Sequence, residues 1–263
     1  MTPHLKRLAT ALILIPLVLI IIIFAPPWVF SLLVMSVALI CLNEYYSFIV
    51  PKASRQVIVL IYFLTVTLFY AVLHRGFSFV AIIPFFFIFI FVSFLFNYKK
   101  NTGTIGDIGQ ILLGPMYINL PLLLLVIIFI FNDGKFWVLF LLTVAFAGDT
   151  ASFYFGKLFG RHKLSDISPG KTIEGAIAGL IAAVVFGCFF SKLFFPSLSI
   201  LSIMLLAFAM AISCQLGDLA ESMLKRISKV KDSGTILPGH GGMLDRVDSL
   251  LFAIPFLYLY LSI

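Results

Sequence analysis

Charged side chains are scarce in this chain of 263 residues, because Asp, Glu, Lys and Arg make up 11% of it and hydrophobic residues 62%. Soluble domains carry about a quarter charged residues, so the composition excludes an ordinary soluble fold. Apolar runs of roughly 20 residues, enough to cross a bilayer as a helix, follow one another along the chain. They do not alternate apolar and polar residues, which excludes a transmembrane β-barrel. The sequence predicts an all-α, polytopic transmembrane helical bundle.

Cysteine is also rare, and Cys41, Cys188 and Cys214 lie far apart in apolar runs. Their spacing fits neither a metal site nor a disulfide framework, so we predict that the three cysteines are small buried hydrophobic side chains.

Residues 170–172 read Gly-Lys-Thr, but the upstream glycine of a phosphate-binding Walker loop is missing. The sequence therefore does not predict a P-loop nucleotide site.

We count nine apolar runs as spans, and no soluble domain fits between them. Lys6 and Arg7 precede the first run, as in a secretory signal. That run is long, however, and no small-residue cleavage pattern follows it, so we predict an uncleaved span. The predicted spans lie near 8–25, 27–49, 56–74, 77–97, 108–131, 136–156, 173–195, 197–223 and 247–262.

Basic residues are distributed unevenly between the connections. With the N-terminus placed inside, 15 of the 18 Lys and Arg residues fall on inner segments, and only Arg75, Lys135 and Lys192 fall outside. Cytoplasmic connections are enriched in Lys and Arg, so the pattern predicts a cytoplasmic N-terminus and an outside C-terminus. Of the 11 acidic residues, only Asp133 falls outside. A channel or transporter needs polar groups along a whole path through the bilayer, which this distribution does not favour.

The inner end of the eighth predicted span carries a polar stripe. Asp218, Glu221, Ser222 and Lys225 are spaced so that they share one face of a helix. A carboxylate within a span is costly unless it meets a cation. Two interpretations remain open: an ion pair that joins two helices, and a ligand of a metal ion.

Asp245 and Asp248 stand three residues apart at the start of the last predicted span, so they project to the same side. Carboxylates that close repel one another unless a proton or a cation intervenes. Mg²⁺ binds through one or two carboxylates together with substrate phosphates, so one interpretation is a site for Mg²⁺, with a second cation left open. The other is a solvated helix N-terminus that the helix dipole favours.

The connection between these two helices is basic and rich in glycine. Its basic residues are too many for the nearby acids alone, and its glycines let backbone amides approach a ligand closely. A phosphate-rich ligand would explain both features, although such a basic run also sets topology or touches anionic lipid. His240 is either a phosphate or nucleotide contact or a plain turn histidine. The basic residues are Lys225, Arg226, Lys229 and Lys231. The residues that let the backbone turn or approach a ligand are Gly234, Pro238, Gly239, Gly241 and Gly242.

A second polar segment, 147–179, repeats this combination. Asp149 lies in the inner half of a predicted span and is followed by glycines and four basic residues. Thr172 or Ser168 is expected to cap the next helix, and we interpret Glu174 as structural or as a base contact rather than as a nucleophile. The basic residues are Lys157, Arg161, Lys163 and Lys171.

These motifs together resemble the phosphatidate cytidylyltransferases, also called CDP-diacylglycerol synthases. The stretch 168–175 resembles a second element of that family, with Gly170 in place of its usual basic residue. The resemblance covers roughly the C-terminal half of the chain. The first five predicted spans match the family only in their hydropathy, with Glu44 as a polar residue that they would share. The main motif is Ser222-x-x-Lys225-Arg226, Lys231-Asp232-Ser233-Gly234 and Pro238-Gly239-His240-Gly241-Gly242-x-x-Asp245-Arg246-x-Asp248; Gly217-Asp218 and Asp149 with Tyr154 and Gly156 also fit.

The resemblance implies transfer of the cytidylyl group of CTP to phosphatidate with Mg²⁺, in phospholipid biosynthesis. It implies metal binding by Asp218, Asp245 and Asp248, with Asp149 as a weaker ligand. Lys225, Arg226, Lys171 and Arg246 would hold phosphate oxygens. Further substrate contacts are Lys231 and His240, then Ser222, Asp232, Gly241 and Gly242.

The expected organisation is one integral membrane domain over 1–263, with N-terminal spans in 1–135 and a catalytic half in 136–263. We expect CTP, phosphatidate and membrane lipids as partners, no nucleic acid, and an active site on the cytoplasmic face of a bacterial inner membrane. A homodimer is left open. Alternative functions are a CTP-dependent polyprenol or phytol kinase and an ion transporter, whereas the Asp-Gly-x-x-Ala-Arg pattern of the CDP-alcohol phosphotransferases is absent.

Overall fold

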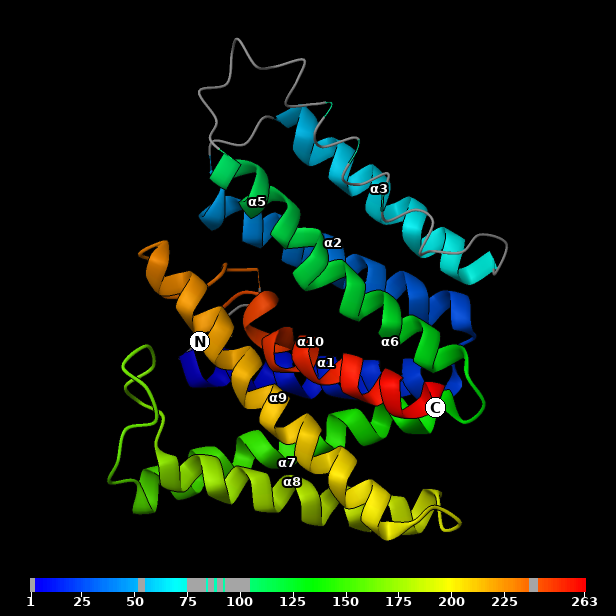
Figure 1. Cartoon of the computed structure of the whole chain (residues 1–263), viewed down its shortest axis with the longest axis vertical. Coiled ribbons are helices and arrows are strands. Elements are labelled where there is room, and N and C mark those ends of the chain that lie inside the picture. The colour runs from blue at the N-terminus through cyan, green and yellow to red at the C-terminus, as the bar shows by residue number, and fades with distance from the viewer. Residues whose placement is uncertain are drawn as a thin grey trace. The chain divides into compact units, whose positions relative to one another are not determined.

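A computed structural model describes residues 3–51, 55–74, 105–236 and 241–263, with the isolated positions Pro84, Ile88 and Val92. Over these residues the chain is made of helices and their connections (Figure 1). The one β-type pairing found there is an isolated antiparallel bridge between Lys163 and Thr172. The all-α prediction is therefore confirmed for this part of the chain.

The chain forms two compact units. Unit 1 comprises Met1–Ile127 and Asp232–Leu244, and unit 2 comprises Ile128–Lys231 and Asp245–Ile263. The segment that precedes the last helix thus belongs to unit 1, while that helix belongs to unit 2 from its second residue onward. The single membrane domain that the sequence indicates stays a prediction.

Unit 1 consists of helices that follow the apolar runs. Pro27 occupies the first position of its helix, where a missing N–H costs nothing and the fixed φ suits the helix. Pro115 begins a π-helical turn in which the amide of Leu120 donates to the Pro115 carbonyl oxygen. The elements are α1 (Pro3–Phe24), α2 (Pro27–Ile49), α3 (Arg55–His74), α5 (Ile105–Gly114), η1 (Pro115–Asn119) and α6 (Leu120–Ile130), whose last residues belong to unit 2.

Hydrogen bonds from buried polar side chains join the helices of unit 1. The Tyr45 hydroxyl donates to the Gln110 carbonyl oxygen at 2.9 Å, and the Tyr46 hydroxyl donates to that of Ile111 at 2.8 Å. Buried polar groups need such partners, so these bonds fix the C-terminal part of α2 against α5. The same part of α2 carries the buried Glu44.

Unit 2 contains α7 (Gly134–Phe159), α8 (Ile173–Phe194), α9 (Ile200–Ile227) and α10 (Leu244–Ser262). Small residues at every fourth position form the buried stripe of α8 and let α7 approach it closely. A Cβ at Gly179 would lie 2.8 Å from the Gly148 carbonyl oxygen, so the two backbones leave no room for a side chain there. The stripe consists of Gly175, Gly179, Ala183, Gly187 and Ser191.

Within the described residues, six helices are long and apolar enough to cross a membrane. The chain is thus an integral membrane protein, as its composition predicts. The predicted span 77–97 lies largely outside the described residues, so the count of nine and the orientation of the termini stay predictions. The six helices are Pro27–Ile49, Arg55–His74, Gly106–Ile130, Gly134–Phe159, Ile173–Phe194 and Ile200–Ile227; Leu14–Phe24 is a shorter apolar helix.

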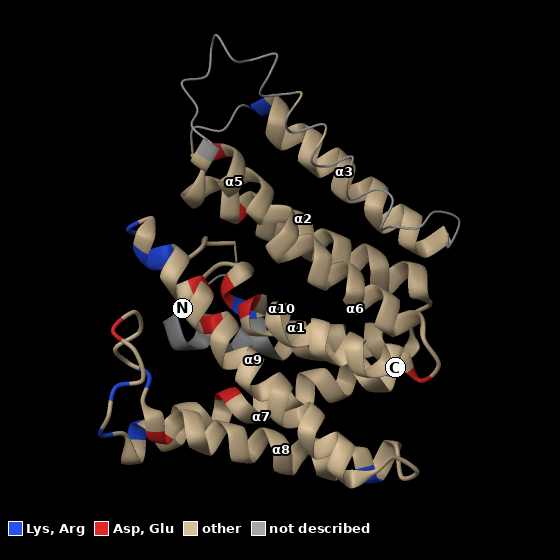
Figure 2. Ribbon diagram, viewed as in Figure 1, with Lys and Arg blue, Asp and Glu red and all other residues tan. Residues whose placement is uncertain are grey.

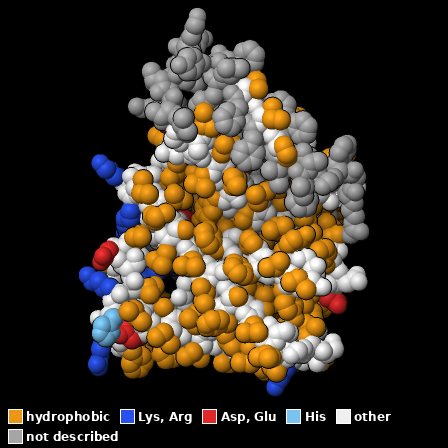
Figure 3. All heavy atoms as spheres, viewed as in Figure 1, with side chains coloured by type: hydrophobic (Ala, Val, Ile, Leu, Met, Phe, Trp, Pro, Cys, Tyr) orange, Lys and Arg blue, Asp and Glu red, His pale blue; other side chains and the backbone are white. Residues whose placement is uncertain are grey.

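Most of the charged residues of unit 2 gather around one end of its helices. Figure 2 shows Lys, Arg, Asp and Glu at the C-terminal end of α9, at the start of α10 and in the connection between α7 and α8. Figure 3 shows hydrophobic side chains over most of the described surface that faces the viewer, as a lipid-exposed surface requires. Polar side chains at one end of the unit 2 helices thus lie beside the apolar surface seen in this view.

Candidate active site

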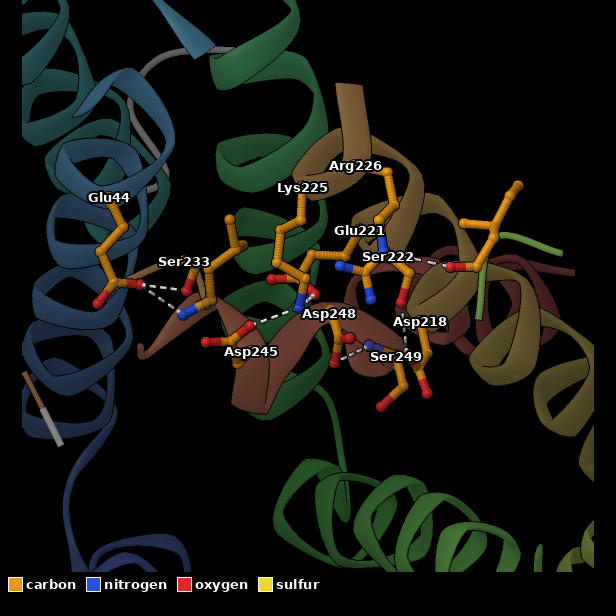
Figure 4. A network of polar contacts seen from close by, with 12 residues as sticks. Glu44, Asp218, Glu221, Ser222, Lys225, Arg226, Ser233, Asp245, Asp248 and Ser249 are labelled. Carbon is orange, nitrogen blue, oxygen red and sulfur yellow. Dashed lines mark hydrogen bonds and ion pairs between the residues drawn. The ribbon is translucent and has the colours of Figure 1, made fainter. Parts of the chain in front are cut away.

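The polar stripe of α9 has the arrangement that its spacing predicts. Asp218, Ser222 and Lys225 lie along one face, and the Ser222 hydroxyl is 3.5 Å from Asp218 Oδ1, to which it donates (Figure 4). Glu221 is fully buried and forms an ion pair with Lys225 one turn further along. The stripe thus alternates carboxylate, hydroxyl and ammonium groups within unit 2.

Helix α10 passes very close to α9 beside Asp218. A Cβ at Gly217 would lie 2.6 Å from the Asp248 carbonyl oxygen, so only glycine permits this approach. Asp248 is 7% exposed, and its Oδ1 accepts a hydrogen bond from the Ser249 amide at 2.8 Å. Asp149 and Asp218 are both near enough to interact electrostatically with Asp248. Three of the four aspartates that the sequence singles out as metal ligands thus lie within electrostatic range of one another.

Asp245, the fourth aspartate, joins the stripe through Lys225. The Lys225 ammonium donates to Asp245 Oδ1 at 2.6 Å and also pairs with Glu221. All three side chains are largely buried. A single lysine therefore compensates two carboxylates from two helices, which is the ion-pair interpretation left open for this stripe.

The connection between α7 and α8 folds back on itself over residues 160–172. Glu174 Oε2 accepts from the amides of Arg161 and His162 at 3.1 and 3.3 Å, and Oε1 lies 2.6 Å from His162 Nδ1. Thr172 caps α8, because its hydroxyl oxygen accepts from the Gly175 amide at 3.2 Å, as the sequence predicts for Thr172 or Ser168. Glu174 thus has a structural role in this connection.

A cavity of about 440 Å³ lies between this connection and helices α7, α8 and α9. Lys171 and Asp218 form an ion pair at its wall, and both side chains remain partly exposed. Gln215 donates from Nε2 to the Ala176 carbonyl oxygen at 2.9 Å, which orients its amide group. The wall also includes Asp149, Ser152, Phe153, Gly156, Lys157, Leu164, Gly170, Thr172 and Gly175. The wall of this cavity therefore carries both signs of charge, from Lys157 and Lys171 and from Asp149 and Asp218.

The remaining predicted residues do not line that cavity. Arg226 is exposed and its Nε donates to the Ile167 carbonyl oxygen at 3.4 Å, which ties the end of α9 to the connection 160–172. Lys231, Asp232 and Arg246 are exposed. Gly241 has φ 82°, a left-handed conformation that favours glycine, and Gly242 is buried. His240 lies outside the described residues.

A model of the cytidylyltransferase family matches residues 5–263. The chain belongs to the cytidylyltransferase family. Together with the relatives described next, this match confirms the resemblance to phosphatidate cytidylyltransferases that its motifs indicate.

Curated relatives carry the name phosphatidate cytidylyltransferase. The chain is 39% identical over 166 residues to that of Bacillus subtilis (strain 168), covering 62% of each chain. It is 47% identical over 133 residues to that of Staphylococcus haemolyticus (strain JCSC1435), covering 49% of this chain and 50% of the relative. For the Staphylococcus aureus (strain COL) protein the identity is 43% over 133 residues, with the same coverage. The matched segments thus span between 50% and 62% of the length of these relatives.

The donors around the α9 stripe of this cytidylyltransferase-family chain suit a hard divalent cation. Asp149, Asp218 and Asp248 offer carboxylate oxygens, and buried Glu221 Oε1 has no hydrogen-bond partner among the described residues. Mg²⁺ prefers oxygen ligands and often takes several from substrate phosphates. In the described ranges no group of three or more His, Cys, Asp or Glu side chains is gathered closely enough to hold a metal. The predicted ligands thus fit in chemistry but stay predictions, and substrate oxygens would complete the coordination.

The sequence interpretation gave too little weight to Glu44. In unit 1 this carboxylate accepts from the Ser233 hydroxyl and from the amides of Met243 and Leu244. The available signal was a lone glutamate in an apolar run, which is costly in a membrane unless donors surround it. Spacing could not identify those donors, since they lie about 190 residues further along the chain.

Proposed function

We propose that this chain is a phosphatidate cytidylyltransferase, which converts CTP and phosphatidate into CDP-diacylglycerol and pyrophosphate for phospholipid biosynthesis. The observation that carries the proposal is the Lys171–Asp218 pair at the wall of a cavity beside Asp149 and Asp248. Such a pocket supplies both a cation for phosphate oxygens and carboxylates for a divalent metal. Family membership and the names of the relatives support the choice of nucleotide and lipid.

The reaction needs little activation of the attacking group, because the phosphate of phosphatidate is already a nucleophile. One of its oxygens bonds to the α-phosphorus of CTP, the bond from that phosphorus to the bridging oxygen of the β-phosphate breaks, and pyrophosphate leaves with the electron pair. Lys171, with Arg226 and Arg246 from the neighbouring segments, would hold phosphate oxygens and balance the growing charge. Asp218 and Asp248, with Asp149 and Asp245 as further candidates, would hold Mg²⁺, which supplies charge neutralisation and orientation of the phosphates.

The proposal includes a membrane arrangement. It has nine spans with the N-terminus in the cytoplasm and the C-terminus outside, and the reaction takes place at the cytoplasmic face of a bacterial inner membrane. The positive-inside distribution of Lys and Arg supports this orientation. The acyl chains of phosphatidate stay in the bilayer while its head group enters from the side. A homodimer and a second cation stay predictions.

The deciding experiment incubates the purified protein with phosphatidate, Mg²⁺ and CTP labelled at either its α- or its γ-phosphorus. The proposal expects α-label in the lipid phase together with released pyrophosphate. Transfer of the γ-label to a lipid alcohol with release of CDP would instead indicate a CTP-dependent lipid kinase. Solute flux in liposomes without CTP, and no label in lipid, would indicate a transporter.

A further inference from the structure

Glu44 organises the segment of unit 1 that leads into α10. Its Oε1 accepts from the Met243 amide at 2.9 Å, and its Oε2 accepts from the Leu244 amide at 2.8 Å. Oε2 also accepts from the Ser233 hydroxyl at 3.1 Å. Both oxygens of one carboxylate therefore hold the two ends of the segment 233–244.

Two glycines of this segment lie so close to the Glu44 carboxylate that neither position has room for a side chain. A Cβ at Gly234 would lie 2.6 Å from Glu44 Oε1, and a Cβ at Gly242 would lie 2.7 Å from Oε2. Any larger residue would push the carboxylate away from its donors. The glycines of the motif therefore have a steric reason that is independent of a direct contact with substrate.

The environment of Glu44 is that of an anion bound at the start of a helix. Glu44 is 3% exposed, and no Lys, Arg or His among the described residues forms an ion pair with it. In the described part of the segment its donors include one hydroxyl and two amides, one of which belongs to the first residue of α10. Helix N-termini present unsatisfied amides and favour negative charge there. Glu44 thus acts as an N-terminal cap supplied by a different helix.

We propose that Glu44 is a positioning residue for the reaction proposed above, on which this inference rests. The Glu44 carboxylate fixes the backbone of Met243 and Leu244, and Asp245 is the next residue of the chain. The first turn of α10, which carries Asp245 and Asp248, then begins from an anchored backbone. Glu44 itself touches neither substrate nor metal in this role.

The amino-acid choice at position 44 makes the proposal specific. Glu44→Gln keeps the shape but replaces one acceptor oxygen by an NH₂ group, which faces an amide or hydroxyl donor whichever way the side chain turns. Glu44→Asp keeps both acceptors on a shorter side chain. A displacement of about 1 Å at a reacting centre can lower the rate about 100-fold. We therefore expect kcat to fall about 100-fold in the Gln variant and less in the Asp variant, with a smaller change in KM for CTP.

The test measures steady-state cytidylyl transfer and hydrogen–deuterium exchange of the same detergent-solubilised proteins. Thr65→Ala is the matched control, because it breaks another buried hydrogen bond of unit 1, which Asn119 Nδ2 donates to Thr65 Oγ1 at 2.8 Å. We expect Glu44→Gln to speed exchange in peptides that cover 241–250 and to lower kcat. The Thr65 variant should speed exchange around α3 and keep the wild-type kcat.

A double-mutant cycle with Ser233→Ala sharpens the result. Since Ser233 and Glu44 share a hydrogen bond, the loss in the double variant should be smaller than the product of the two single losses. Wild-type kcat in an active Glu44→Gln protein, or a fall that Thr65→Ala matches at equal stability, would overturn the positioning role alone. A wild-type protein that transfers no α-label would overturn the proposed function, and this role for that reaction with it.

Discussion

In each unit a glutamate carboxylate accepts several hydrogen bonds from one connection of the chain. Glu174 accepts from two amides and lies against a histidine side chain, and Glu44 accepts from two amides and a serine hydroxyl. The hydrogen-bond patterns are nearly the same, but the Glu174 side chain is 28% exposed whereas Glu44 is 3% exposed. Water can replace the first set of bonds and cannot readily replace the second. Burial rather than the number of bonds should therefore decide what each glutamate contributes.

Two of the lysines of unit 2, Lys225 and Lys171, repeat this contrast. Lys225 is 14% exposed between carboxylates that are 0% and 10% exposed, and Lys171 is 28% exposed against an Asp218 that is 38% exposed. An ion pair that water reaches exchanges partners at little cost, and a buried one does not. We therefore expect Lys225 to have a mainly structural role. Lys171 lies at the cavity wall, and we expect it to be able to turn from Asp218 toward a phosphate group.

The largest expected loss of stability follows from Lys225→Met. The change leaves Glu221 and Asp245 buried without their cation, which costs roughly 3–5 kcal/mol in comparable pairs. Unfolding in mixed detergent micelles measures the loss. Lys231→Met, which removes an exposed charge nearby, is the control and should leave the unfolding free energy unchanged. Adding Glu221→Gln to Lys225→Met should restore part of the loss, and a Lys225 variant as stable as the wild type would break the contrast.

The second largest effect is expected for Glu44→Ala. The Ser233 hydroxyl and the amides of Met243 and Leu244 lose their acceptor in a buried place, and unsatisfied buried groups cost about 1–3 kcal/mol each. Because some water will enter the space, we expect a total of about 2–4 kcal/mol. The same unfolding assay measures it. A loss no larger than that of the matching Glu174→Ala variant would contradict the importance of burial.

Helical spacing accounts for what the sequence predicts correctly about the candidate site. Asp218 and Ser222 share a face of α9 because they are one turn apart, and Asp245 and Asp248 share the first turn of α10 for the same reason. The spans follow from long apolar runs, as in α2, whose bounds match the predicted run. Contacts within one helix are thus readable from the chain.

Contacts between distant segments are not readable in this way. Nothing in the spacing says that Lys171 pairs with Asp218 or that Lys225 turns to Asp245 rather than to a phosphate. The choice depends on how closely two helices pack, and here Gly217 permits an approach that any side chain would block. The apolar pattern likewise does not reveal the π-helical turn that begins at Pro115.

Lys171→Met is expected to change activity far more than stability. The partly exposed pair with Asp218 contributes at most about 1 kcal/mol, and salt screens it further. Losing one cation that balances charge in the transition state lowers kcat about 100-fold or more. Lys163→Met is the matched control, since it removes a charge from the same connection without touching the cavity wall. Activity equal to the wild type in the Lys171 variant would remove this lysine from the proposed site.

The smallest effect on stability is expected for Glu174→Gln. The new amide oxygen can still accept from the amide of Arg161 or His162, and water reaches the bonds that are lost, so thermal unfolding should coincide with that of the wild type. The connection 160–172 should open more often, and limited trypsin digestion should cleave faster after Arg161 and Lys163. Slow digestion in both Glu174→Gln and Glu174→Ala would show that the antiparallel bridge between Lys163 and Thr172 holds the connection without the glutamate. A loss of stability as large as that of Glu44→Ala would mean that two similar sets of hydrogen bonds contribute equally, whatever their exposure to water.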